Sequence, residues 1–307
     1  SGGQSAEAWS RTHDRVFLGG EFWANPMEDW QIAAGGAECR SLGGNRSIHS
    51  RTHQITKPTE GFTLSVRVSQ LEVRGKDAGA GFRVGVRSEL NEYRSNCFAA
   101  RGLNAGVAEG QLLLGPKTVP LATGANTKNM ELLLTGVATG AEVALTLEAR
   151  AGDSGASLGK LVHTVPADTL LGNVALVSNY GADSTQTAPK KAPKTTSQGE
   201  SRYRFTDWKI AGDAFTVSSA QRFGPLLWSM YSLSDSRTAE GWVMKISALT
   251  GPMGPSDSHV VELHVQRGGA WQSLGEAKLD PDAWVATFRI PRWDEKKATP
   301  YKLVYRE

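Results

Sequence analysis

The sequence predicts an all-β protein built from two β-sandwiches, of which the first and larger is a jelly roll. Three observations lead to this prediction. Apolar and polar residues alternate with a period of two in many short segments, as they do in strands with one face in a core and the other in water. Helical periodicity is nearly absent. Gly, Asn and Asp residues separate the segments at intervals typical of turns.

The composition agrees with two packed domains. The chain has 307 residues, 39% of them hydrophobic, and nine Trp. It has no apolar run of about 18 residues, so we expect no membrane span. The first residues, SGGQSAEAW, lack the basic and apolar regions of a signal peptide. Such a peptide was never present, has been removed, or is not included in this sequence. The net charge of +3 is spread along the chain and does not indicate a nucleic-acid partner.

The first sandwich contains the clearest alternating segments. In GFTLSVRVSQLEV, apolar residues from Phe62 to Val68 occupy the even positions, and polar residues including Arg67 occupy the odd ones. Such a strand places its even positions in a core. Strands are predicted in the same way at residues 61–73, 79–88, 141–150 and 172–181.

A Lys- and Pro-rich tract, residues 187–199, separates two similar segments of the first sandwich. EDWQIAAGGAEC (28–39) and FTDWKIAGDAF (205–215) both contain Asp-Trp, a polar residue, Ile and Ala. A jelly roll often pairs its first strand with its last, which protects both edges. We therefore predict that 187–199 is a surface loop inside one domain, residues 1–213, and that residues 214–307 form the second domain.

The second domain is predicted to be an immunoglobulin- or fibronectin-like sandwich. It has about 90 residues and a turn every 8–12 residues, as such sandwiches do. LDPDAW provides the turn chemistry of one tight connection. Its strands are expected within residues 223–234, 241–249, 258–267, 270–279, 283–291 and 300–307.

No catalytic or metal-binding residue is predicted in this chain. Asp257 and His259 form an Asp-x-His pair, which opens the metal site of many metallophosphoesterases, but the further Asp, Asn and His ligands of a two-metal site are missing. We therefore expect a turn before a strand there. Paired glycosidase carboxylates, GxSxG and a P-loop are also missing.

The cysteines and two of the tryptophans are interpreted as core residues. Cys39 and Cys97 fit no zinc spacing, and two buried thiols are favoured over a disulfide between them. Trp30 and Trp208 lie within strand patterns. Core packing is therefore favoured for them over stacking on a sugar.

Odd positions of three predicted strands carry basic residues that we interpret as a candidate ligand face. Arg side chains on one outward face suit bidentate contacts with a sulfated or phosphorylated polymer, and histidines would strengthen binding below about pH 6.5. Gly85 leaves room for a ligand or another backbone. The alternatives are an ordinary solvated surface or a docking face for another domain. The candidate residues are His49, Arg51, His53, Arg67, Arg83 and Arg87.

Four segments carry a family resemblance. Residues 20–55 and RYRFTDWKIAGDAF are similar to the start and the closing strand of a concanavalin A/laminin G-like domain. RFGPLLWSMYSLS and residues 268–307 resemble the immunoglobulin-like domain that follows it in bacterial alkaline phosphatase D-like metallophosphatases. The resemblance covers almost the whole chain.

The resemblance implies export to the periplasm or the extracellular space, for which the twin-arginine route is one option. It also implies a C-terminal metallophosphatase domain that hydrolyses phosphate esters with divalent metals. The metal-ligand motifs of that family have no counterpart here, so no catalytic residue and no cofactor is assigned to this chain. The main hypothesis is a non-catalytic region that positions or targets such a phosphatase. The alternatives are a free-standing carbohydrate-binding or adhesive module, and a jelly-roll polysaccharide hydrolase or lyase.

Overall fold

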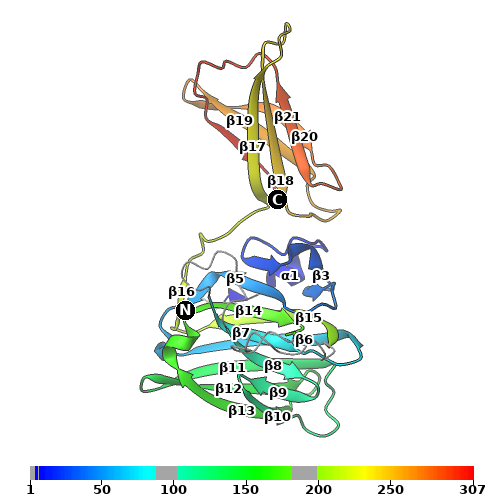
Figure 1. Ribbon diagram of the computed structural model, residues 1–307, viewed down its shortest axis with the longest axis vertical. Helices are drawn as coiled ribbons and strands as arrows, with labels where there is room; N and C mark the ends of the chain where they lie inside the picture. The colour runs from blue at the N-terminus through cyan, green and yellow to red at the C-terminus, as the bar shows by residue number, and fades with distance from the viewer. Residues whose placement is uncertain (1–3, 6, 88–101, 182–198) are drawn as a thin grey trace, which may run out of the picture. The chain divides into compact units, whose positions relative to one another are not determined.

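The computed structural model describes residues 4–5, 7–87, 102–181 and 199–307. Within these residues the regular secondary structure consists almost entirely of β-strands, which confirms the predicted all-β class (Figure 1). It forms two compact units: residues 1–14 with 21–222, and residues 15–20 with 223–307.

Unit 1 contains two antiparallel eight-stranded sheets, which we call sheet A and sheet B. Sheet A has the order β13-β12-β11-β6-β15-β4-β3, with β1 beside β15; sheet B has the order β10-β9-β8-β7-β14-β5-β16, with β2 beside β5. The strands of sheet A are β1 (Gln4–Ser5), β3 (Trp30–Ala33), β4 (Gly36–Cys39), β6 (Phe62–Arg74), β11 (Asn129–Thr139), β12 (Glu142–Ala151), β13 (Ser157–Pro166) and β15 (Glu200–Ala211). Those of sheet B are β2 (Phe22–Asn25), β5 (Arg46–Ile55), β7 (Ala80–Val86), β8 (Leu103–Ala108), β9 (Gln111–Leu114), β10 (Lys117–Pro120), β14 (Gly172–Ser178) and β16 (Phe215–Val217). The short helices are α1 (Glu7–Arg11), η1 (Met27–Asp29), η2 (Pro58–Glu60) and η3 (Ala167–Leu170).

The core of unit 1 lies between the two sheets and follows the alternation in the sequence. In sheet A, Leu64 and Leu134 stand side by side in register, and both are buried. In sheet B, Leu176 stands between Ile48 and Phe82, all fully buried. The backbone N–H of Tyr203 in β15 donates to Ser178 Oγ in β14, which links the sheets. An aromatic group of Trp9, Phe22 and Trp208 closes one part of the core.

The segment after the Lys- and Pro-rich tract belongs to unit 1. Residues 182–198, and so nearly all of the predicted loop 187–199, lie outside the described residues. The strands on either side, β14 and β15, both belong to unit 1. β15 pairs with β4, with Phe205 opposite Ala37, so the predicted pairing of the first and last segments is confirmed. The units divide after Arg222 rather than at residue 213, because β16 pairs with β5.

The predicted core roles of the tryptophans are confirmed. Trp30 is completely buried and Trp208 is 1% exposed. Cys39 is buried as well, and its thiol donates a hydrogen bond to Ser41 O at 3.3 Å. Cys97 lies outside the described residues, so the expectation for the two cysteines as a pair stays a prediction.

Unit 2 consists of two antiparallel three-stranded sheets, which we call sheet C and sheet D. Sheet C has the order β17-β18-β21, and sheet D has the order β20-β19-β22. Both contribute to one core, which includes Ile246, Phe288 and Leu263. The strands are β17 (Leu226–Asp235), β18 (Trp242–Thr250), β19 (Val260–Arg267), β20 (Ala270–Lys278), β21 (Val285–Ile290) and β22 (Tyr301–Val304).

A short N-terminal segment, residues 15–20, is part of unit 2, which was not predicted from the sequence. The backbone N–H of Phe17 donates to Pro252 O at 2.9 Å, and its ring meets that of Phe223 edge to face. Arg15 forms an ion pair with Asp257 at 3.2 Å. The segment has no alternating pattern, so nothing in its sequence indicated where it packs.

Candidate functional site

The first candidate site is the face of sheet B that points away from the core of unit 1. Residues opposite each other on neighbouring strands share a face of the sheet. Ala175 of β14 is opposite both His49 of β5 and Arg83 of β7, and Arg83 is opposite Asn104 of β8. Because their neighbours Leu176 and Phe82 point into the core, these residues point outward. We call His49, Arg83, Asn104 and Asn173 the polar face.

Hydrogen bonds determine the tautomer of His49 in the polar face, and burial determines its charge. Asn173 Nδ2 donates to Ser50 O at 2.5 Å, which leaves Asn173 Oδ1 as the acceptor 2.9 Å from His49 Nδ1. His49 therefore carries its proton on Nδ1, and Nε2 accepts from Ser47 Oγ at 2.9 Å. Burial lowers the pKa of His49 to about 4, with a smaller contribution from the charge of Arg83. The imidazole is thus neutral at pH 7.

Arg83 is the charged centre of the polar face and is only 5% exposed. Its Nε donates to Asn104 Oδ1 at 2.8 Å, and its Nη2 donates to Asn45 Oδ1 at 3.2 Å. The guanidinium lies 6.0 Å from the ring centre of Tyr180. Burial lowers its pKa, but an arginine stays protonated in proteins. Within the described part of the chain, no carboxylate forms an ion pair with it.

Glycines hold Arg83 and its aromatic neighbour in place. The Tyr180 hydroxyl donates to Phe82 O at 3.0 Å and lies over Gly106, where any Cβ would collide with it. A Cβ on Gly102 would come within 2.7 Å of Arg83 Cγ. Only glycine at these positions leaves room for the observed conformations of both side chains.

The predicted basic face, in contrast, does not form. Arg67 lies on β6 of sheet A, whereas Arg83 lies on β7 of sheet B, because the chain passes from one sheet to the other between these strands. Arg67 Nε is 3.4 Å from Asp207 Oδ2, and the Arg67 side chain is 45% exposed. The two arginines are therefore on different sheets and cannot share the expected face.

The remaining candidates are separated by irregular pairing. The β5–β14 register shifts between Asn173 and Ala175, so the alternation that positions His49 does not reach His53. The His53 ring packs against Phe215 at 5.7 Å, and burial lowers its pKa. Arg51 is half-buried on the same strand, and its backbone N–H donates to Glu21 O.

A second irregularity, at Gly85, separates Arg87 from the alternating positions of the predicted basic face. Gly85 has φ of 70°, and the β7–β14 register shifts there. The backbone of η3 fills the space beside this glycine, where a Cβ would collide with Thr169 O, so a backbone rather than a ligand takes the room expected there. Arg87 follows the end of β7 and is half-buried. The pH expectation is also corrected, because the pKa of His49 is about 4 rather than near 6.5.

The amide members of the polar face were not predicted from the sequence. Asn104 and Asn173 are 2% and 6% exposed within strands. Asn is depleted in strands. An Asn inside a predicted strand was therefore the sequence signal that could have indicated these members of the polar face. Asn45 precedes β5 with φ of 57°, and its position beside Arg83 depends on contacts between distant segments.

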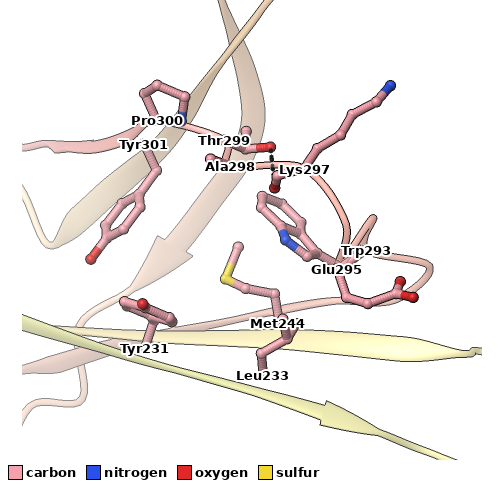
Figure 2. Close-up of a pocket in the computed structure, with 10 residues that line it drawn as sticks. All are labelled: Tyr231, Leu233, Met244, Trp293, Glu295, Lys297, Ala298, Thr299, Pro300 and Tyr301. Atoms are coloured by element: carbon pink, nitrogen blue, oxygen red, sulfur yellow. Dashed lines mark hydrogen bonds between the residues drawn. The ribbon is translucent and has the colours of Figure 1, made fainter.

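The second candidate site is a pocket of about 400 Å³ in unit 2, shown in Figure 2. Tyr231, Leu233 and Met244 line it from sheet C, and Tyr301 lines it from β22. The rings of Tyr231 and Tyr301 meet edge to face, with centres 6.0 Å apart. The other lining residues come from the connection between β21 and β22: Trp293, Glu295, Lys297, Ala298, Thr299 and Pro300. Figure 2 shows the charged ends of Glu295 and Lys297 directed away from Met244 and the aromatic rings.

Asp257 and His259 form a structural turn, as expected. Asp257 accepts from the backbone N–H of Gly254 at 2.6 Å, and His259 Nε2 lies 2.9 Å from Gly254 O. Asp257 also pairs with Arg15. Over the described ranges, no three His, Cys, Asp or Glu residues are grouped so as to hold a metal ion. Those ranges also contain no helix long and apolar enough to cross a membrane.

Comparison with known proteins gave similarities to solved structures only. No family model matches the chain, and no curated protein sequence matches it. Lectin II from Ulex europaeus is 13% identical to this chain, with a TM-score of 0.39. The alignment covers 62% of this chain and 90% of the lectin. The Ca²⁺-bound VIP36 exoplasmic/lumenal domain is 8% identical, with a TM-score of 0.40 and coverage of 63% and 83%. The potassium-bound Emp46p carbohydrate recognition domain is 10% identical, with a TM-score of 0.36 and coverage of 62% and 86%.

Proposed function

We propose that this chain is a non-catalytic binding protein, and that the polar face of unit 1 binds an acidic polysaccharide with Arg83 as the anion subsite. One observation carries the proposal. A buried, permanently charged guanidinium has only neutral amide acceptors and an aromatic ring around it in the described structure. A buried charge is expensive unless it is paired, and a bound anion would supply the missing partner.

The remaining donors of Arg83 fit a carboxylate. Nε and one N–H of Nη2 are occupied by Asn104 and Asn45. The two Nη1 donors make no hydrogen bond to a described residue, and they lie beside the second N–H of Nη2. Nη1 and Nη2 together form a planar fork that matches the two oxygens of a carboxylate.

The charge of the site favours a polymer with one anionic group at each bound position. His49 is neutral at pH 7 because its pKa is about 4, and Arg67 lies on the other sheet. A densely sulfated chain would need several cations on one face. A uronic acid polymer needs one cation at each bound position, which Arg83 provides.

An aromatic residue borders the same face. Trp23 of β2 is opposite His49 and half-buried, so its indole points outward beside the polar face. Tyr180 lies beneath the guanidinium. An indole offers a flat apolar surface with one hydrogen-bond donor, which suits the C–H face of a sugar ring beside the carboxylate subsite.

The hypothesis of a phosphatase-linked role stands beside this proposal. The resemblance to alkaline phosphatase D-like proteins implies an exported chain that positions or targets a metallophosphatase domain, and polysaccharide binding would give such a region its target. The two-sheet order of unit 1 supports the concanavalin A/laminin G-like domain implied there. A free-standing carbohydrate-binding module uses the same site, so the binding proposal does not depend on this choice.

The proposal is tested with polygalacturonate, a uronic acid polymer, and with dextran, a neutral one. Affinity electrophoresis of the wild type, Arg83→Gln and Arg67→Gln gives the comparison, with Arg67→Gln as the matched control on sheet A. We expect retardation by polygalacturonate only, and a loss of about tenfold or more in Arg83→Gln, since a charge-assisted hydrogen bond contributes about 1.5–3 kcal/mol. Arg67→Gln should bind as the wild type does.

A second variant separates loss of binding from loss of folding. Asn104→Asp places a carboxylate about where Asn104 Oδ1 accepts from Arg83 Nε, so the fold gains an ion pair while the ligand loses its site. We expect weaker binding with an unchanged or higher melting temperature. Equal retardation of Arg83→Gln and wild type, or a loss in Arg67→Gln alone, would contradict the proposal.

A further inference from the structure

The Arg83 guanidinium is held along one edge by two carboxamides. Its Nε donates to Asn104 Oδ1 at 2.8 Å, and its Nη2 donates to Asn45 Oδ1 at 3.2 Å. The planar group turns about the bond between Cδ and Nε. A hydrogen bond at Nε, which lies on that axis, restrains the rotation less than one at Nη2, which lies off it. Asn45 therefore decides which way the fork of Nη1 and Nη2 faces.

Asn45 is itself held by the turn that follows β14. The backbone N–H of Asn45 donates to Asn179 O at 2.6 Å, which joins two segments that are far apart in the sequence. Both residues are in the left-handed conformation, with φ of 57° at Asn45 and 66° at Asn179. Asn adopts this conformation more readily than most residues other than glycine. Asn179 is only 1% exposed, so the turn is a buried support for Asn45.

The Asn179 side chain strengthens this support with hydrogen bonds at both ends of its carboxamide. Nδ2 donates to Leu42 O at 2.7 Å and to Gly199 O at 3.0 Å. Oδ1 accepts from the backbone N–H of Gly181 at 3.1 Å. Leu42 lies three residues before Asn45, so Asn179 holds the segment that carries Asn45 through its side chain as well as through its backbone.

We propose that Asn45 is a positioning residue of the anion subsite, and that it makes Arg83 select a planar carboxylate over a tetrahedral sulfate or phosphate group. The inference rests on the function proposed above for Arg83. Asn45 acts through the guanidinium, which it aligns before a ligand arrives, and Asn179 acts one step further away by holding Asn45. A preorganised donor loses less conformational freedom when it binds.

The shapes of the anions explain the selectivity. A carboxylate on a sugar ring has its two oxygens in one plane, so both meet the fork only when that plane and the guanidinium coincide. A sulfate ester has three oxygens around one axis, so a rotated fork still meets two of them. The third oxygen then needs a donor, but the described partners of Arg83, Asn104 Oδ1 and Asn45 Oδ1, are acceptors. A buried charged oxygen without a donor is costly, so the aligned fork favours the carboxylate.

The test compares galacturonate with galactose 6-sulfate, two sugars that carry their charge at the same ring substituent. Binding is followed at constant ionic strength by the NMR signal of the Arg83 side-chain Nε–H. We expect the wild type to bind galacturonate about fivefold or more tightly than galactose 6-sulfate. In Asn45→Gly, galacturonate affinity should fall about three- to tenfold and the two affinities should become nearly equal, because the fork is no longer aligned.

Matched variants separate alignment from folding. Glycine adopts the left-handed conformation without strain, so Asn45→Gly and Asn179→Gly remove the side chains and keep the backbone; both should lower the preference for galacturonate. Glu109→Gly is the control, since Glu109 has φ of 50° in the turn between β8 and β9, and it should bind as the wild type does. In the absence of sugar, the NMR order parameter of the Arg83 Nε–H bond should fall in Asn45→Gly and stay unchanged in Glu109→Gly.

A further variant, Asn45→Asp, tolerates the same conformation and places a carboxylate beside Arg83 Nη2. It should bind neither sugar and should melt at an unchanged or higher temperature; binding of galacturonate as in the wild type would count against the inference. Equal binding of both sugars by the wild type, or an unchanged preference in Asn45→Gly, would overturn the inference and leave Arg83 as an anion subsite. No response of Arg83 to either sugar in the wild type would instead overturn the proposed function together with the inference.

Discussion

The burial of His49 makes a quantitative prediction about the pH dependence of stability. The pKa of His49 falls from 6.5 to about 4 in the folded chain, chiefly because burial disfavours the charged form. Between these two values the unfolded chain binds more protons than the folded one, so stability increases with pH in this window. Lowering the pH from 7 to 5 should therefore cost about 2 kcal/mol from this group alone.

The assay is urea denaturation of the wild type and His49→Gln at pH 7 and pH 5. Gln can donate to Asn173 Oδ1 and does not titrate, so the variant should lose about 2 kcal/mol less than the wild type between the two pH values. His53 contributes in the same direction, because burial lowers its pKa too, and it is present in both proteins. Equal pH dependence in wild type and variant, or an NMR titration of His49 near pH 6.5, would refute the reasoning.

Three further predictions concern packing, a buried hydroxyl and activity. Trp208→Ala should destabilise unit 1 by about 3–5 kcal/mol in urea denaturation, because it empties the centre of the aromatic group with Trp9; a change below about 1 kcal/mol would contradict this. Tyr203→Phe should cost about 1–3 kcal/mol, because the Tyr203 hydroxyl donates to Asp77 at 2.7 Å, and an unchanged midpoint would argue against it. The purified chain should not hydrolyse nitrophenyl phosphate with or without divalent metal, and turnover that is abolished by Asp257→Asn would overturn that expectation.

The strand positions were predictable because local alternation records which face of a strand is buried. β6 and β12 lie within a residue or two of the segments predicted from their apolar positions. The repeated Asp-Trp segments also indicated correctly that the strand from Glu200 belongs to unit 1. In each case a local pattern was sufficient, since period-two alternation follows directly from strand geometry.

The candidate site was less predictable because it depends on which strands become neighbours. Arg67 and Arg83 have the same local pattern, yet β6 and β7 enter different sheets, and no single strand reveals that choice. Gly85 marked an irregular position, but only the structure shows that the backbone of η3 occupies the space beside it. Residues 15–20 joined unit 2 through contacts with residues more than 200 positions away.

The central claim is that Arg83 is the anion subsite of the polar face. The most direct measurement is an NMR titration of the wild type with oligogalacturonate, observing the side-chain Nε–H signals of the arginines and the side-chain amides of Asn104 and Asn45. We predict saturable shifts of the Arg83 and Asn45 signals, which increase in step, while the Arg67 signal stays unchanged. Shifts confined to Arg67 or other exposed arginines, or no shift of Arg83 at saturating ligand, would contradict the account.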